Sequence, residues 1–208
     1  MKRAGRPRRQ ALAGLVRPDD GVIIDVGADH GHVAAAVGAI ATERMPGRRG
    51  RTDVPWVIAD GLAPFRRVDT AIIAGMGARA ILRILDRGPR PERAAIVHAQ
   101  DDPIRLRCGL AACGWRIEAE SLAWEAGRYA EIIRVEPGIE AATGCALELG
   151  PRLVRGDSPD LEAHLRHLRT YFAHIAERTQ GRAPAKHSRC SARVAYIDSI
   201  LSQRFRAS

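Results

Sequence analysis

Short apolar runs separated by turn residues recur through the first two thirds of the chain. They cover residues 22–26, 38–42, 56–59, 70–75 and 94–99. Continuous apolar runs of this length are typical of buried parallel strands. Residues 78–88 have helical spacing instead, with an apolar face that ends at Gly88. Alternating strands and helices predict an α/β fold built on a doubly wound sheet. The apolar face of the helix consists of Ile81, Leu82, Ile84 and Leu85.

Two longer strand-like runs follow at residues 115–125 and 127–137, with Gly127 where they meet. A glycine between two such runs favours a hairpin, so we predict an antiparallel pair that closes one edge of the sheet.

The pattern changes near Gly150-Pro151, and we predict a sheet domain over residues 1–150 and a helical appendage over residues 151–208. Ser158 is a candidate N-cap and Pro159 a candidate first residue of an amphipathic helix that runs to residue 180. Residues 190–205 repeat the amphipathic pattern after a loop. Two such helices predict a small C-terminal helical hairpin.

The formal charge of +9 indicates a polyanionic partner, because basic side chains that neutralise phosphates release condensed counterions. Basic residues are concentrated in the first ten residues, in residues 44–51 and in residues 151–208. The last of these segments holds 11 basic and 5 acidic residues. Nearly all the basic residues are arginines, so a coding bias or ordinary solvated charge remains an alternative explanation.

The chain contains no stretch of the roughly 18 uninterrupted apolar residues that a membrane span needs, and its basic start lacks the apolar run of a signal peptide. We therefore expect a cytoplasmic protein that does not bind a membrane. The four cysteines form no CxxC pair and no zinc-ligand spacing, so we expect neither disulfides nor a metal.

The strongest local signal lies at residues 23–33, where an apolar strand ends in Asp25 and continues into a turn with Gly27 and Gly31. Glycine in such a turn lets the backbone approach a bound ligand. The segment is neither a full GxGxxG dinucleotide fingerprint nor a P-loop. D-x-G-x-x-x-G suits S-adenosylmethionine better, although an ordinary tight turn between a strand and a helix could also produce it.

Acidic residues follow the next two candidate strands. Glu43 lies 18 residues beyond Asp25, where a carboxylate can accept hydrogen bonds from both ribose hydroxyls of an adenosine ligand. The alternative is one continuous helix over residues 31–45 with Glu43 on its surface, which Gly38 and the β-branched residues after it disfavour. Asp60 could accept a hydrogen bond from an adenine amino group, or could simply follow a strand.

Two glycines surround Met76 at the end of the strand predicted at residues 70–75. Gly75-Met76-Gly77 leads directly into the helix at residues 78–88. Small residues at the carboxyl edge of an open sheet leave room for a planar substrate beside a bound S-adenosylmethionine.

In order and content, these segments resemble the bacterial tRNA methyltransferases that modify N1 of the adenine at position 22. That family has the motifs D-x-G-[ST]-D-H, I-A-x-E, G-D-G-L and A-G-M-G-G, and an arginine that opens its first helix, where this chain has Arg9. The matching segments here are Asp25-Val26-Gly27-Ala28-Asp29-His30, Ile40-Ala41-Thr42-Glu43, Ala59-Asp60-Gly61-Leu62 and Ala74-Gly75-Met76-Gly77-Ala78. Residues 113–122 and 149–154 also resemble family segments, so the resemblance covers almost the whole chain.

The resemblance implies a class I methyltransferase with a Rossmann-like sheet, S-adenosylmethionine as cofactor and tRNA as partner, and we expect a monomer or weak dimer. The candidate cofactor-binding residues are Asp25, Gly27, Glu43, Asp60, Gly61, Gly75 and Met76. The candidate substrate-binding residues are Arg9, Arg48, Arg49 and Gly77. Asp29 is the candidate catalytic carboxylate, because alkylation of adenine N1 places positive charge on the base. His30 could position the base or take a proton from N6, or could be a structural hydrogen-bond partner.

The chain departs from the family in three places. A proline- and arginine-rich loop, residues 44–55, replaces an expected helix, so we predict a trimmed fold. Gln100-Asp101-Asp102 stands where the family has Gln-Pro-Asn, and His32 stands where it has an aromatic residue. Two other functions stay open: a methyltransferase that acts on a small molecule or a protein, and a catalytically silent relative that binds RNA.

Overall fold

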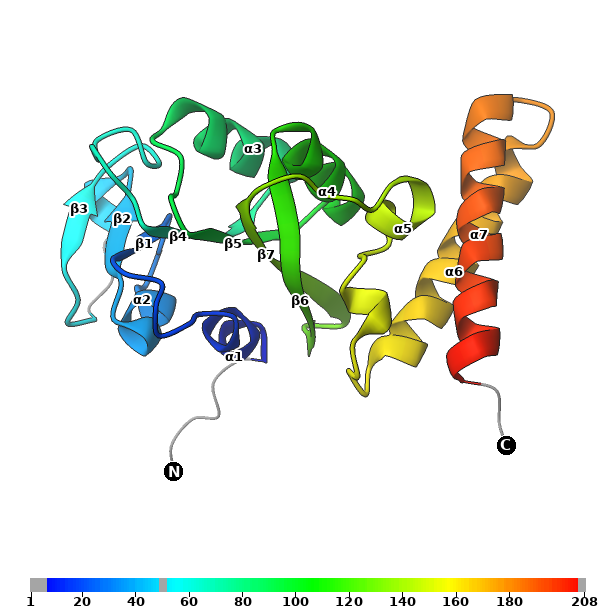
Figure 1. Ribbon diagram of the computed structural model, residues 1–208, viewed down its shortest axis with the longest axis horizontal. Helices are drawn as coiled ribbons and strands as arrows, with labels where there is room; N and C mark the ends of the chain where they lie inside the picture. The colour runs from blue at the N-terminus through cyan, green and yellow to red at the C-terminus, as the bar shows by residue number, and fades with distance from the viewer. Residues whose placement is uncertain (1–6, 49–51, 206–208) are drawn as a thin grey trace. The chain divides into compact units, whose positions relative to one another are not determined.

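The structure is a computed structural model that describes residues 7–48 and 52–205. The chain divides into two compact units, Met1–Ala141 and Ala142–Ser208. The first unit contains the sheet, and the second contains the C-terminal helices (Figure 1). The division falls ahead of Gly150-Pro151, in the segment that follows the last strand.

In the described part of the first unit, seven strands form one sheet in the order β3-β2-β1-β4-β5-β7-β6. The first five strands in this order are parallel, and β7 is antiparallel to both of its neighbours. The predicted doubly wound α/β sheet with an antiparallel edge pair is thus confirmed. The strands are β1 (Ile23–Val26), β2 (Ile40–Glu43), β3 (Trp56–Ile58), β4 (Thr70–Met76), β5 (Ala94–Ala99), β6 (Trp115–Glu125) and β7 (Arg128–Pro137).

Helices cover both faces of this sheet. Figure 1 shows α1 (Pro7–Gly14) and α2 (His32–Val37) on one face, and α3 (Ala78–Arg87) and α4 (Pro103–Ala112) on the other. Leu12 of α1 packs in one buried cluster with Ile72 of β4 and Ile96 of β5, so α1 closes the sheet over its central strands. Burial of these apolar side chains is the main force that holds the layers together.

The predicted trimming is confined to the helical layers. Between β2 and β3, the described residues form only the short 3-10 helix η1 (Pro46–Arg48), and residues 59–69, between β3 and β4, contain no helix. β3 nevertheless pairs in parallel with β2, with Thr42 opposite Val57. Backbone hydrogen bonds to β2 therefore keep the edge strand β3 in place without a covering helix.

The alternative of a continuous helix through Glu43 is wrong. α2 ends at Gly38, whose φ of 70° is the left-handed conformation that commonly terminates a helix. The chain then enters β2, in which Ile40 pairs with Ile24 of β1. Glu43 is consequently the last residue of a strand.

The second unit consists of α5 (Gly144–Glu148), the 3-10 helix η2 (Leu153–Arg155) and a hairpin of α6 (Leu161–Thr179) and α7 (Pro184–Arg204). The predicted helical hairpin is confirmed, but the predicted starts of its helices are wrong, and α7 begins at Pro184 within the segment expected to be a loop. Ser158 and Pro159 lie in a turn, in which the Leu161 amide donates to the Ser158 carbonyl, and α6 begins only after that turn. In the described residues, no helix is both long and apolar enough to cross a membrane.

Candidate active site

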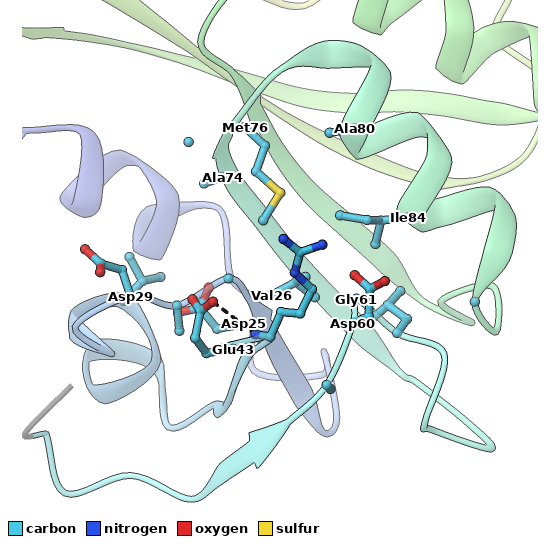
Figure 2. A pocket seen from close by; sticks show the side chains of 18 of the residues that line it. Asp25, Val26, Asp29, Glu43, Asp60, Gly61, Ala74, Met76, Ala80 and Ile84 are labelled. Atoms are coloured by element: carbon cyan, nitrogen blue, oxygen red, sulfur yellow. Dashed lines mark hydrogen bonds between the residues drawn. The ribbon is translucent and has the colours of Figure 1, made fainter. Parts of the chain in front are cut away.

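A cavity of about 1010 Å³ opens at the carboxyl ends of the parallel strands. Its walls include Asp25 of β1, Glu43 of β2, Asp60 after β3 and Met76 of β4. Parallel strands end at the same edge of a sheet, so acids at the ends of successive strands are brought to one place. Figure 2 shows the carboxyl groups of Asp29, Glu43 and Asp60 spaced along this cavity.

The turn after β1 forms one end of the cavity and depends on glycine. Gly27 has a φ of 67°, and a Cβ there would lie 2.4 Å from Cε of Met76. The next amide, that of Ala28, donates to the Thr42 carbonyl at 3.0 Å and so fixes the turn against β2. A larger residue at position 27 would strain the backbone at this positive φ and would also push the terminal methyl of Met76 aside.

Asp25 lies beneath this turn and is only 4% exposed. Its Oδ2 accepts a hydrogen bond from the Ala34 amide in α2 at 3.1 Å. Burial outweighs this bond and raises the pKa of the Asp25 carboxyl to about 7. The charge of Asp25 is therefore sensitive to what occupies the cavity.

Glu43 is held in a fixed orientation at the end of β2. Its Oε1 accepts hydrogen bonds from the Arg44 amide at 3.0 Å and the Met45 amide at 3.3 Å. The carboxylate is half-buried and lines the cavity. An acceptor held in this way can take hydrogen bonds from a diol without losing much side-chain entropy on binding.

The opposite end of the cavity combines an acid with an apolar wall. Asp60 is exposed, and Gly61 follows it with a φ of 67°. A Cβ at Gly61 would lie 3.2 Å from Cγ2 of Ile84, so glycine allows α3 to approach this turn. Ile84 lines the cavity beside Asp60, where it can cover the face of a planar ring (Figure 2).

Asp29 and His30 lie on the same cavity wall, in the turn after Gly27. Asp29 has a φ of 51°, a left-handed conformation that Asp tolerates better than most residues. Its Oδ2 lies 3.5 Å from Nε2 of His30, and both side chains are largely exposed. The ring of His32, which also lines the cavity, lies 5.8 Å from that of His30. The turn and the start of α2 thus present one carboxylate and two imidazoles to an incoming substrate.

The segment after β4 forms the remaining wall. The pairing of β4 with β5 shifts register between Ala74 and Met76, so Gly75, with a φ of 77°, is the extra residue of a bulge. Gln100 donates from its amide to the Gly75 carbonyl and also lines the cavity. The side chain of Met76 points into the cavity (Figure 2).

The two acids that replace the family's Pro-Asn have structural partners. Asp101 Oδ1 accepts from the Ala78 amide at 2.8 Å and from the Asp102 amide at 2.7 Å. The bond from Ala78, at the start of α3, is the main cause of a lowered pKa for Asp101. Asp102 caps α4 by accepting from the Arg105 amide at 2.9 Å. These substitutions therefore anchor two helices beside the cavity.

Most of the residues singled out from the sequence line this one cavity. They are Arg9, Asp25, Gly27, Asp29, His30, Glu43, Asp60, Gly61, Gly75 and Met76. Gly77 precedes α3 beside Asp101 and is outside the lining. Arg48 ends η1, and Arg49 lies outside the described residues.

Basic side chains also line the cavity. Arg8 and Arg44 come from two of the basic stretches singled out in the sequence, whereas sequence reasoning missed Arg83 and Arg87. Arg83 and Arg87 are one helical turn apart on α3 and flank Ile84. That spacing was visible in the sequence, but it becomes informative only once α3 is known to border the cavity. In the described parts of the chain, no group of three or more His, Cys, Asp or Glu is arranged to hold a metal.

Comparisons with known proteins agree with this geometry. A family model described as tRNA (adenine(22)-N(1))-methyltransferase matches residues 39–199. No curated protein matches the chain.

Several solved structures are similar to the chain. One is Sp1610 of Streptococcus pneumoniae in complex with S-adenosyl-L-methionine, at 24% identity and a TM-score of 0.73, covering 93% of this chain and 98% of that one. Another is the B. subtilis m1A22 tRNA methyltransferase TrmK, at 19% identity and a TM-score of 0.72, covering 94% and 98%. A third is M. capricolum TrmK in complex with S-adenosyl-homocysteine, at 16% identity and a TM-score of 0.74, covering 94% of this chain and 96% of that one. At these identities the structures establish a shared fold.

Proposed function

The chain belongs to the tRNA (adenine(22)-N(1))-methyltransferase family, whose members use S-adenosylmethionine, and we propose that the cavity at the carboxyl edge of its sheet is where the methyl group passes to adenine N1. The observation that carries this proposal is the convergence of acids from three strand ends with the Asp29–His30 turn in one cavity. Such a cavity can hold an adenosine-containing donor and a second planar group together.

The donor would lie across the ends of β1, β2 and β3. Glu43 would accept hydrogen bonds from the ribose hydroxyls, and Asp60 would accept one from the adenine amino group. Ile84 would cover the adenine face, and the glycine turn after β1 would let the backbone approach the donor's amino-acid part. Asp29 and His30, which follow the same glycine turn, would then meet the target adenine beside the donor.

Glu43→Ala is expected to weaken donor binding by roughly 1–3 kcal/mol, because it leaves partly buried ribose hydroxyls without an acceptor. Isothermal titration calorimetry measures the effect. Asp86→Ala is the matched control, since Asp86 is an exposed acid of α3 outside the cavity lining. Equal donor affinity for Glu43→Ala and the wild type would contradict the ribose assignment.

Methyl transfer to N1 is an in-line displacement: the N1 lone pair forms the new bond while the carbon–sulfur pair returns to sulfur. No covalent nucleophile is needed, and positioning accounts for much of the rate. The base gains positive charge, which the carboxylate of Asp29 would stabilise more in the transition state than in the ground state. N1 lies on the Watson–Crick edge, so the adenine must be unpaired when it enters.

The second unit offers a basic surface for the RNA backbone. Four of its arginines pair with acids: Arg166 with Glu162, Arg169 with Asp198, Arg193 with Glu148, and Arg204 with Asp157. Four other basic residues are exposed and gather where α6 meets α7. We call Arg178, Arg182, Lys186 and Arg189 the hairpin-end cluster. This cluster is the part of the unit best suited to bind phosphates.

Replacing the hairpin-end cluster with glutamine is expected to flatten the dependence of tRNA affinity on salt. Each lost phosphate contact lowers the slope of log K against log salt by about 0.7–0.9, so four substitutions should lower it by roughly 3–4. Filter binding at several salt concentrations measures the slope. The control is Arg166→Gln with Arg169→Gln, which removes arginines that already have carboxylate partners. An unchanged slope would place the phosphate contacts elsewhere.

Transcripts that differ at one position test the proposed reaction. The wild-type protein is expected to transfer labelled methyl to a tRNA with adenine at position 22 and not to the same tRNA with guanine there. Equal labelling of both transcripts would contradict the proposed target.

A further inference from the structure

The β6–β7 hairpin ends in an aromatic pair, the exposed Trp124 and the half-buried Tyr129, that the donor site does not use. Trp124 and Tyr129 lie opposite each other across the two strands, with ring centroids 4.6 Å apart. The indole of Trp124 is 49% exposed, whereas Trp115, at the other end of the same strand, is 2% exposed. A half-exposed tryptophan beside a second aromatic ring is a surface that favours contact with another planar group.

Strand register places this pair beside the cavity. β7 is antiparallel to β5, with Val97 opposite Ile133. Continuing that register past the end of β5 brings Tyr129 opposite Asp101, the residue after the cavity-lining Gln100. The hairpin end therefore lies at the carboxyl edge of the sheet, where the cavity opens.

An ion pair between the hairpin end and α1 also places the hairpin end beside the cavity. Glu125, next to Trp124, pairs with Nε of Arg8 in α1 at 3.2 Å, and Arg8 itself lines the cavity. The turn between the strands is tight: its two residues, Ala126 and Gly127, have φ values of 53° and 78°. Positive φ at both positions matches the type I′ turn of a two-residue hairpin, so the aromatic pair is held rigidly before any ligand arrives.

We propose that Trp124 and Tyr129 form a stacking platform for an unpaired tRNA nucleobase next to the target adenine. This rests on the proposed function, because an adenine that enters the cavity through its Watson–Crick edge must leave its stack, which exposes the neighbouring base. Aromatic side chains replace lost stacking without regard to base identity. Arg128, exposed between the two aromatic residues in sequence, is placed to contact the adjoining phosphate.

Trp124→Ala in the full-length protein tests the platform. Loss of one stacked base should raise the KM for tRNA roughly ten- to hundred-fold, while the Kd for the donor stays within twofold. Trp124→Phe should keep the KM within a few fold, since it keeps an aromatic face. Ile139→Ala is the matched control: Ile139 is 89% exposed and follows β7 at its opposite end, so its loss should leave both constants unchanged. Saturating tRNA should quench part of the indole fluorescence of the wild type, and this part should be absent from Trp124→Phe.

Three results would overturn the platform, and they differ from one another. A wild type that methylates tRNA and a Trp124→Ala variant with the same KM would remove the platform and leave the proposed function intact. Equal losses in Trp124→Phe and Trp124→Ala, together with lower unfolding temperatures, would make the pair a structural element of the hairpin. A wild type that binds the donor and methylates no tRNA would remove the proposed function and the platform with it.

Discussion

Asp29→Asn is expected to lower the rate of methyl transfer by about 100-fold while the affinity for the donor changes by no more than a few fold. Asn keeps the size of the side chain and can hydrogen-bond, but it removes the negative charge. If positive charge builds on the adenine during the reaction, this loss corresponds to roughly 3 kcal/mol of transition-state stabilisation. Asp29 has a φ of 51°, and Asn tolerates that left-handed conformation as Asp does. The backbone turn should therefore survive the substitution.

Single-turnover measurements at saturating tRNA and donor isolate the chemical step. His30→Asn in parallel shows whether the neighbouring imidazole, 3.5 Å from the Asp29 carboxylate, contributes to the same step. If Asp29→Asn instead abolished donor binding and left the residual chemical rate intact, Asp29 would belong to the donor site.

Asp25→Asn is expected to stabilise the ligand-free protein by about 2–4 kcal/mol at pH 8. Burial raises the pKa of this carboxyl from 3.8 to about 7, so the folded state disfavours the ionised form. The resulting penalty is absent below pH 4, grows as the pH rises toward 7, and is complete above 7. At about 1.4 kcal/mol per pKa unit, the full penalty is roughly 4–5 kcal/mol. The new amide has its own cost of burial, which reduces the gain.

Urea denaturation at pH 5 and pH 8 measures the free energy of unfolding and its change with pH. The wild type should lose stability between these values relative to Asp25→Asn, and the exposed Asp86→Asn should follow the wild type. The same Asp25→Asn variant should bind the donor more weakly at pH 8, since the carboxylate is better suited than an amide to a cationic ligand. A pH slope shared by the wild type and Asp25→Asn would show that this carboxyl does not carry the penalty.

The parts of the site that sequence predicts well are those tied to strand ends. Asp25, Glu43 and Asp60 follow successive apolar runs, and parallel pairing brings such residues to one edge whatever the connecting segments do. For the same reason, the missing helices around β3 do not disturb the site. The trimmed fold was the reason for considering a catalytically silent relative that binds RNA. The described residues form a seven-stranded sheet, so the trimming does not extend to the strands.

Other features depend on tertiary geometry that no local pattern encodes. Arg83 and Arg87 reach the cavity because α3 packs close to Gly61, and Trp124 lies near the cavity only through the register of β7 on β5. Ser158 and Pro159 match a helix start in sequence, but the chain first makes a turn there. Local propensity is weak enough for such tertiary context to override it.

We propose that this chain methylates N1 of adenine in tRNA at the cavity on the carboxyl edge of its sheet. Mass spectrometry of nucleosides from tRNA incubated with the protein and a methyl-labelled donor tests it most directly. We expect labelled 1-methyladenosine, formed by the wild type and strongly reduced with Asp29→Asn. Label in a different nucleoside, or no label in tRNA from a protein that binds the donor, would contradict it.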